Sequence, residues 1–113
     1  MSEGVLVGLM TAPDRAGAEK IVDRLVQERL IACGNISMAV SSIYRWQGAL
    51  ARDDEVLVIM KTTESQAARV IERVRELHPY EVPEVLFLPV TVGYEAYIQW
   101  VRESVPSPQD MEE

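Results

Sequence analysis

The apolar positions of the chain fall into alternating extended and helical patterns. Residues 5–10 read VLVGLM, a short apolar run rich in branched side chains, which predicts a strand buried on both faces. From residue 18 to residue 26 the apolar side chains recur every three or four positions, with charged residues on the opposite face, which predicts an amphipathic helix. Thr11, Pro13 and Asp14 precede this helix and favour a helix start, with Thr11 as the cap. The chain is therefore expected to begin with a strand and a helix.

The next segment alternates over an unusual length. No proline interrupts residues 31–46, and one face of this segment is expected to carry Ile36, Met38, Val40, Ser42, Tyr44 and Trp46. Gln47 and Gly48 offer a turn, and a second extended run covers residues 55–62. Together these segments predict a β-hairpin.

A hairpin built on residues 31–46 is longer than the domain that carries it. At about 3.3 Å per residue this strand would reach ~50 Å, whereas a compact domain of about 100 residues is roughly 35 Å wide. The hairpin must project beyond its own domain, or a bulge near Gly34 must split the strand in two. We favour the projecting form. Because Ile43, Tyr44 and Trp46 lie near the tip, such a hairpin exposes apolar anchors and an unpaired edge, which predicts an oligomer.

The second half of the chain continues with a helical pattern. Thr63 and Gln66 have the spacing of a capping box, and an apolar stripe runs through residues 67–74. A residue before proline is pushed out of helical geometry, so His78 before Pro79 is expected to end this helix.

The last elements complete a recognisable order. Residues 85–90 read VLFLPV and predict a strand, in which Pro89 favours an edge position or a strand end. Residues 94–103 predict a short amphipathic helix. The order β-α-β-β-α-β-α predicts an α+β, ferredoxin-like split βαβ fold, in which two helices cover one face of an antiparallel sheet. Residues 1–104 are expected to form one domain, and the polar, proline-containing residues 105–113 a flexible tail.

Composition narrows the range of partners. The 113 residues carry a formal net charge of −7, with 18 acidic residues against 11 Lys and Arg. Nucleic-acid and membrane-surface binding both need a basic face, so neither partner is expected. The N-terminal residues lack a signal-peptide pattern, and no apolar stretch approaches the ~20 residues needed to cross a bilayer. Cys33 is the only cysteine, which excludes an internal disulfide and predicts a cytoplasmic protein.

Six short segments occur in an order that resembles a known family. They are TAPD after the first strand, LIACGNI before the long strand, SIYRWQG at the hairpin tip, KTT, ELHPYEVPE and LPV. Together, from about residue 5 to residue 100, they resemble the CutA family of divalent-cation tolerance proteins. The resemblance implies a ferredoxin-like subunit in a homotrimer whose long hairpins pair between subunits, with an architecture similar to the PII signal proteins. It also implies a link to tolerance of copper and other divalent metals, and copper binding by some members, but no defined molecular activity.

Catalysis has little support in the residues. Neither a P-loop nor a G-x-G-x-x-G pattern is present, and Cys33 is not set in a nucleophile motif. Cys33 and His78 could still meet in space as a nucleophile and its base. Residues 52–56, RDDEV, are interpreted as a solvated turn before a strand. We therefore predict a protein that is not an enzyme and requires no cofactor.

Copper suits the few metal-ligand types that the chain offers. Thiolate and thioether favour Cu(I) and imidazole favours Cu(II), so the candidate ligands are Cys33, His78 and Met10. In a split βαβ fold these residues need not converge within one subunit, although a subunit interface could bring them together. The alternatives are a small buried apolar role for Cys33 and a core position for Met10. For His78, the expected structural role is a hydrogen bond from one ring nitrogen to a carbonyl, with the other nitrogen free for a metal.

A ligand cleft is a third hypothesis, and it depends on the resemblance. Similarity to the PII architecture implies clefts between subunits, where Trp46, Lys61, Tyr80 and Glu84 could form an aromatic and polar lining. Alternatively, these residues anchor an interface, which is the interpretation that we favour for Trp46, while the roles of Lys61 and Glu84 stay open. The leading hypothesis is a non-enzymatic divalent-cation tolerance trimer that can bind copper or another divalent cation. The second is a trimeric PII-like signalling module that binds a small ligand at these clefts.

Overall fold

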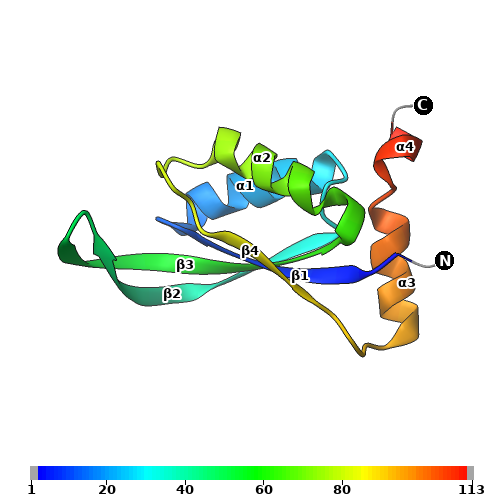
Figure 1. Cartoon of the computed structure of the whole chain (residues 1–113), viewed down its shortest axis with the longest axis horizontal. Coiled ribbons are helices and arrows are strands. Elements are labelled where there is room, and N and C mark those ends of the chain that lie inside the picture. Colours follow the sequence, from blue (N-terminus) through cyan, green and yellow to red (C-terminus); the bar gives the residue numbers. More distant parts are fainter. Residues whose placement is uncertain (1–2, 112–113) are drawn as a thin grey trace.

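Four strands and three helices follow the predicted order in the part of the chain that the structure describes, and a fourth, short helix lies in the segment expected to be a tail. The computed structural model describes residues 3–111. Its elements are β1 (Val5–Ala12), α1 (Arg15–Gln27), β2 (Cys33–Trp46), β3 (Ala49–Thr63), a 3₁₀ turn η1 (Glu64–Gln66), α2 (Ala67–Leu77), β4 (Val85–Pro89), α3 (Glu95–Ser104) and α4 (Pro108–Met111) (Figure 1). All strand pairs are antiparallel, and the order across the sheet is β2-β3-β1-β4. The α+β, ferredoxin-like prediction is confirmed, and Pro89 does lie on an edge strand.

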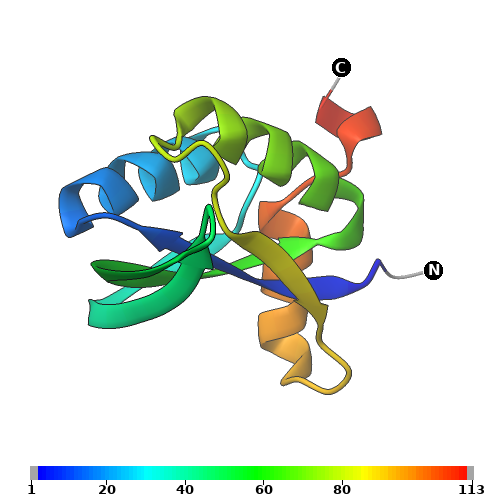
Figure 2. The same ribbon diagram turned by 60° about the vertical axis from the view of Figure 1, so that its left-hand side comes forward.

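The core lies between the sheet and the first two helices. Figure 2 shows α1 and α2 side by side on one face of the sheet. Met10, Val58 and Met60 of the central strands are fully buried there, as are Leu25 of α1 and Val70 of α2. The apolar stripes that predicted the two helices therefore form one side of a single core. Within residues 3–111, no helix is long and apolar enough to span a bilayer.

The start of α1 differs from the prediction. Asp14, not Thr11, caps the helix, because its Oδ1 accepts a hydrogen bond from the Gly17 backbone N–H at 2.7 Å. Thr11 belongs to β1, which pairs with β3 as far as Ala12 opposite Val56. The longer strand moves the helix start by three residues.

The predicted capping box before α2 is wrong. Thr63 makes no capping hydrogen bond, and residues 64–66 form a 3₁₀ turn. The buried side chain of Gln66 instead donates from Nε2 to the Pro106 carbonyl at 2.7 Å. Val105 is also buried, at 1% exposure, so packing continues past the expected boundary at residue 104. Of the expected tail, residues 112–113 lie outside the described residues.

The long hairpin projects beyond the helices (Figure 1). The molecule measures 47 × 30 × 25 Å along its principal axes. Strands β2 and β3 pair continuously to the two-residue turn at Gln47 and Gly48, where both residues have positive φ. A bulge is present, but it lies between Ile36 and Ala39 and does not split the strand. The bulge adds one residue and so exchanges the two faces of β2: Ile36 pairs with Val58 on the core side, whereas the opposite face carries Val40, Ser42, Tyr44 and Trp46. The prediction that all of these residues and Met38 share one face is therefore wrong, but the projecting form is confirmed.

The face of the sheet opposite α1 and α2 is apolar and largely uncovered. The strand register places six apolar side chains on this face: Val7, Leu9, Leu57, Ile59, Leu86 and Leu88. We call these residues the open face. Leu86 and Leu88 remain 46% and 51% exposed. Helix α3 covers only one end, where Val5 packs with Val101 and Val105. An antiparallel sheet can leave one face to water, but that face is normally polar.

Candidate functional site

The three predicted metal ligands do not come together within one chain. Met10 is fully buried on the helix side of the sheet. Cys33 is paired with Lys61, which is paired with Val7, so Cys33 lies on the other side of the sheet. Met10 is three residues further along β1 than Val7, which is roughly 10 Å at the rise of a strand. Among residues 3–111, no three His, Cys, Asp or Glu side chains gather in a way that could hold a metal ion.

His78 has both of its ring nitrogens in hydrogen bonds. The Tyr80 backbone N–H donates to Nδ1 at 3.1 Å, so Nδ1 carries no proton. Nε2 then carries the proton and donates to the Thr11 carbonyl at 2.7 Å. The side chain is 6% exposed, and its ring lies 4.6 Å from the Tyr80 ring. The predicted carbonyl bond is confirmed, but the prediction of a free second nitrogen is wrong because the turn after Pro79 brings the Tyr80 amide back onto the ring.

Cys33 lies beside helix α3. Its Sγ is 3.5 Å from the Tyr97 hydroxyl, and the side chain is half-buried. This hydrogen bond, together with burial, raises the pKa of Tyr97 to about 12. Cys33 is thus the one predicted metal ligand that lies on the uncovered side of the sheet.

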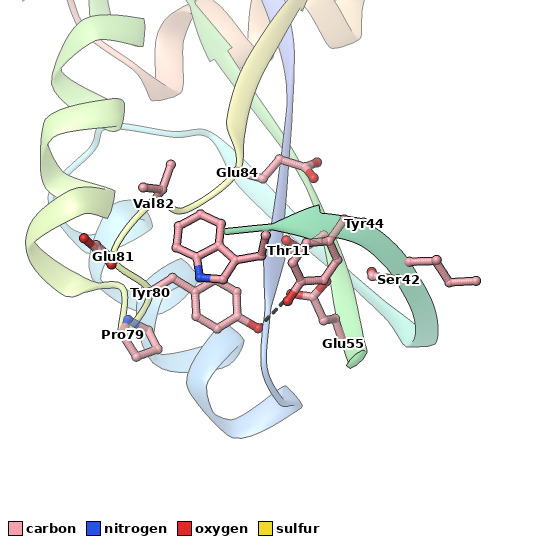
Figure 3. Close-up of a pocket in the computed structure, with 11 residues that line it drawn as sticks. Thr11, Ser42, Tyr44, Glu55, Pro79, Tyr80, Glu81, Val82 and Glu84 are labelled. Carbon is pink, nitrogen blue, oxygen red and sulfur yellow. Dashed lines mark hydrogen bonds between the residues drawn. The ribbon is translucent and has the colours of Figure 1, made fainter. Parts of the chain in front are cut away.

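Three of the four predicted cleft residues line one pocket. Trp46, Tyr80 and Glu84 border a space of about 730 Å³ between the hairpin, the end of β1 and the loop of residues 79–84. Figure 3 shows Tyr80 and Glu84 at this pocket. Lys61 is not among the residues that line it. It lies next to Cys33 on β2, and its Nζ donates to the Asn35 side chain. The pocket forms within one chain, whereas the sequence analysis expected it between subunits.

Glu55, the most buried polar residue of this pocket, was not among the predicted site residues. Glu55 is 7% exposed, and its Oε2 accepts a hydrogen bond from the Tyr80 hydroxyl at 2.7 Å (Figure 3). Burial and this carboxylate raise the pKa of Tyr80 well above its usual value. The interpretation of residues 52–56 as a solvated turn is wrong, because β3 begins at Ala49 and Glu55 pairs with Val40 inside the sheet. If the two strands are paired residue by residue from the Gln47–Gly48 turn, Glu55 falls opposite Val40, so the sequence contained the signal that Glu55 lies in the sheet.

A second tyrosine of the pocket is also bonded to a carboxylate. The Tyr44 hydroxyl donates to Oδ2 of Asp53 across the hairpin. This bond is the main reason that the pKa of Tyr44 is raised. Both phenol groups that line the pocket therefore point a hydroxyl at an acidic side chain.

Fold and site together define a ferredoxin-like α+β domain with a long hairpin and a pocket between that hairpin and the loop of residues 79–84. Residues 6–104 match the family described as CutA1 divalent ion tolerance protein. A relative from Thermus thermophilus, described as divalent-cation tolerance protein CutA, is 46% identical over 98 residues, covering 87% of this chain and 95% of the relative. The chain belongs to the CutA1 family.

More distant relatives and solved structures agree with this assignment. Protein CutA of Homo sapiens is 41% identical over 106 residues; the match covers 94% of this chain but 59% of the human protein. A chloroplastic CutA of Arabidopsis thaliana is 39% identical, and 54% of its length is matched. The solved CutA1 structure from Thermus thermophilus has a TM-score of 0.88 at 44% identity, over 90% of this chain and 99% of that structure.

Proposed function

We propose that this chain acts in divalent-cation tolerance as a homotrimer and without catalysing a reaction. Family membership supports the tolerance role, since bacterial relatives from Thermus thermophilus and Escherichia coli are described as divalent-cation tolerance proteins. The observation that carries the assembly is the open face, which is apolar and uncovered in the single chain. A large exposed apolar surface on a protein of this size is typical of an interface.

Three copies are the number that the family resemblance implies. The projecting hairpin supports an assembly of this kind, because its tip lies beyond the chain's own helices and carries exposed Ile43 and Leu50. Such a tip would pack on a neighbouring subunit. No cofactor is expected, and the acidic charge argues against nucleic-acid and membrane partners. Cytoplasmic location stays a prediction; a solved relative from Archaeoglobus fulgidus is described as periplasmic.

Copper does not fit the residues of one chain. Met10 lies in the core, His78 has both nitrogens engaged, and Cys33 lies on the opposite face of the sheet from Met10. Direct copper binding is therefore proposed only for the assembled protein, where a neighbouring subunit could add ligands near the thiol of Cys33. A soft thiolate suits Cu(I).

A copper titration of the assembled protein tests this proposal. We expect Cys33→Ser to lower Cu(I) affinity by roughly tenfold or more, since it removes a thiolate ligand. Met10→Leu is the matched control, because it replaces a buried thioether with an apolar side chain of similar size. In a strain that lacks its own CutA, the parent chain should restore growth in copper. If Cys33→Ser leaves the copper affinity unchanged, Cys33 is not a copper ligand. If the parent chain fails to restore growth, the proposed role in tolerance is contradicted.

The pocket supports a second candidate function. Trp46, Tyr80 and Glu84 line a space of a size that accepts small molecules. We propose that the assembled protein binds a small ligand there, as a signalling module would. The similarity to PII proteins in signalling stays a prediction.

A further inference from the structure

The side chains that line the pocket share one sign of charge. Three are carboxyl groups and three are aromatic rings: Glu55, Glu81, Glu84, Tyr44, Trp46 and Tyr80. Among the described residues, none that lines the pocket is Lys, Arg or His. Figure 3 shows the side chain of Glu55, from the hairpin, meeting the side chain of Tyr80, from the loop of residues 79–84, with Glu84 above them in this view. These three glutamates are part of the chain's formal net charge of −7.

Glu55 is a buried carboxylate without a cation. Its Oε2 accepts one hydrogen bond, from a neutral phenol. Its Oε1 accepts none from any described residue, and none of the ion pairs within residues 3–111 includes Glu55. The residue as a whole is 7% exposed, and Oε1 is not among the fully buried atoms without a partner in the described residues, so it can be reached from the pocket. A buried charge is normally paired, so this wall of the pocket lacks a positive group.

The aromatic side chains suit a positive group with an apolar body. The faces of tyrosine and tryptophan rings attract an ammonium or guanidinium group, most strongly where water is excluded. The raised pKa values of Tyr44 and Tyr80 agree with a negative local potential, because nearby carboxylates contribute to both shifts. Each hydroxyl already donates to a carboxylate and so is not free to bind an anion.

We propose that this pocket binds a small organic cation, an amine whose ammonium group donates to Oε1 of Glu55 and whose apolar body lies against Trp46 and Tyr80. The proposal rests on the second candidate function above and names its class of ligand. A nucleotide or another phosphate would meet three carboxylates and no basic side chain, so an anionic ligand of the kind that a phosphate-binding signalling module recognises is disfavoured.

Calorimetric titration of the full-length assembled protein with three probes tests the ligand class. We expect phenethylamine, an ammonium at pH 7, to bind saturably and more weakly at high salt. Its anionic counterpart 3-phenylpropionate, and ATP, should not bind. Glu55→Gln should weaken phenethylamine binding by roughly tenfold, the usual effect of removing one charged hydrogen bond. Glu72→Gln is the matched control, since it removes the same charge from an exposed position on α2 and should leave binding unchanged.

A second variant covers the case in which Glu55→Gln disturbs folding. Glu84 lies on the loop that borders the pocket, and Glu84→Gln should also weaken phenethylamine binding, by roughly threefold. Binding of 3-phenylpropionate or ATP in place of phenethylamine would overturn the cation proposal and leave the small-ligand function standing. If no probe binds and Glu55→Gln changes the mass of the assembly, the pocket is occupied by a neighbouring copy of the chain. That result would overturn both the cation proposal and the small-ligand function.

Discussion

His78 ties together three parts of the chain that are distant in sequence. His78 ends α2. Its Nε2–H donates a hydrogen bond to the Thr11 carbonyl near the end of β1, and its Nδ1 accepts one from the Tyr80 backbone N–H in the following loop. Tyr80 in turn bonds Glu55 of β3. One imidazole therefore positions the aromatic wall of the pocket. Pro79 keeps the ring in place at little entropic cost, because it restricts the backbone next to His78 in the unfolded chain as well.

Substituting His78 by Gln tests this structural role. The Gln side chain carries its donor and its acceptor on the same carbon atom, so it cannot reach both the Thr11 carbonyl and the Tyr80 N–H as the two ring nitrogens do. One buried donor or acceptor is then left unpaired. We expect a loss of about 1–3 kcal/mol of unfolding free energy, measured by thermal or urea unfolding after treatment with a chelator. The chelator removes any contribution of metal binding. A variant that melts with the parent under these conditions, yet loses copper binding, would show that His78 is chiefly a ligand.

At this scale the pocket could be predicted only in part. Trp46, Tyr80 and Glu84 were grouped through the family resemblance, and the structure places all three on one pocket. Lys61 lies on the same face of β3 as Glu55, but it is six residues further along the strand, roughly 20 Å from the pocket. Glu55 was missed because a run of acidic residues is usually solvated, and only pairing with Val40 places it inside the sheet.

At the scale of elements, α1 and α2 are joined by a partly buried ion pair. Glu28 follows the last residue of α1, and Arg73 lies on α2. The guanidinium of Arg73 donates through two nitrogens to the two oxygens of Glu28, at 2.8 and 2.9 Å. This bidentate contact is the main reason that the pKa of Glu28 is lowered. The two helices that cover the core are thus fixed to one another at this end of α1.

The ion pair gives stability a defined dependence on pH. A carboxyl whose pKa is lower in the folded state stabilises the fold above its unfolded value, and this contribution is lost as the pH falls through the folded value. We expect Arg73→Gln to lower the free energy of unfolding at pH 7, and the difference from the parent to shrink as the pH falls below about 4.5 and through the lower folded pKa of Glu28. Urea unfolding at matched protein concentration measures both. Arg75→Gln, on the same helix in an exposed pair with Glu72, should show a smaller effect. A difference that stays unchanged as the pH is lowered well below 4.5 would mean that Arg73 acts through packing alone.

Most elements could be predicted because each has a pattern of its own. The helical repeats, the long alternation and the Gln47–Gly48 turn are local signals, and they produced the expected helices, strand and turn. The bulge between Ile36 and Ala39, which exchanges the faces of β2, was not contained in the alternation. The helix caps are different. Thr11 and Asp14 are both capping residues, and the choice between them depends on where β1 stops pairing with β3. That endpoint is a contact between residues far apart in sequence, so the local pattern does not contain it.

At the scale of the whole molecule, the single chain leaves two surfaces without a partner. The hairpin extends past the helices. The open face exposes leucines, whereas the solvent-facing side of a sheet in a monomeric protein normally carries polar residues. Both surfaces would be covered by further copies of the chain. A buried area of that kind stabilises an assembly in proportion to its apolar content.

Light scattering at micromolar concentration tests the assembly directly. We expect a mass of three times the 12.7 kDa of the chain. Leu88→Asp should lower this mass, because it places a charge on the open face, while the fold of each chain survives since Leu88 is 51% exposed there. Val26→Asp is the matched control: Val26 is 39% exposed on α1, away from the open face, and the trimer should persist. A monomeric parent, or a Leu88→Asp variant that assembles like Val26→Asp, would mean that the open face is not the interface.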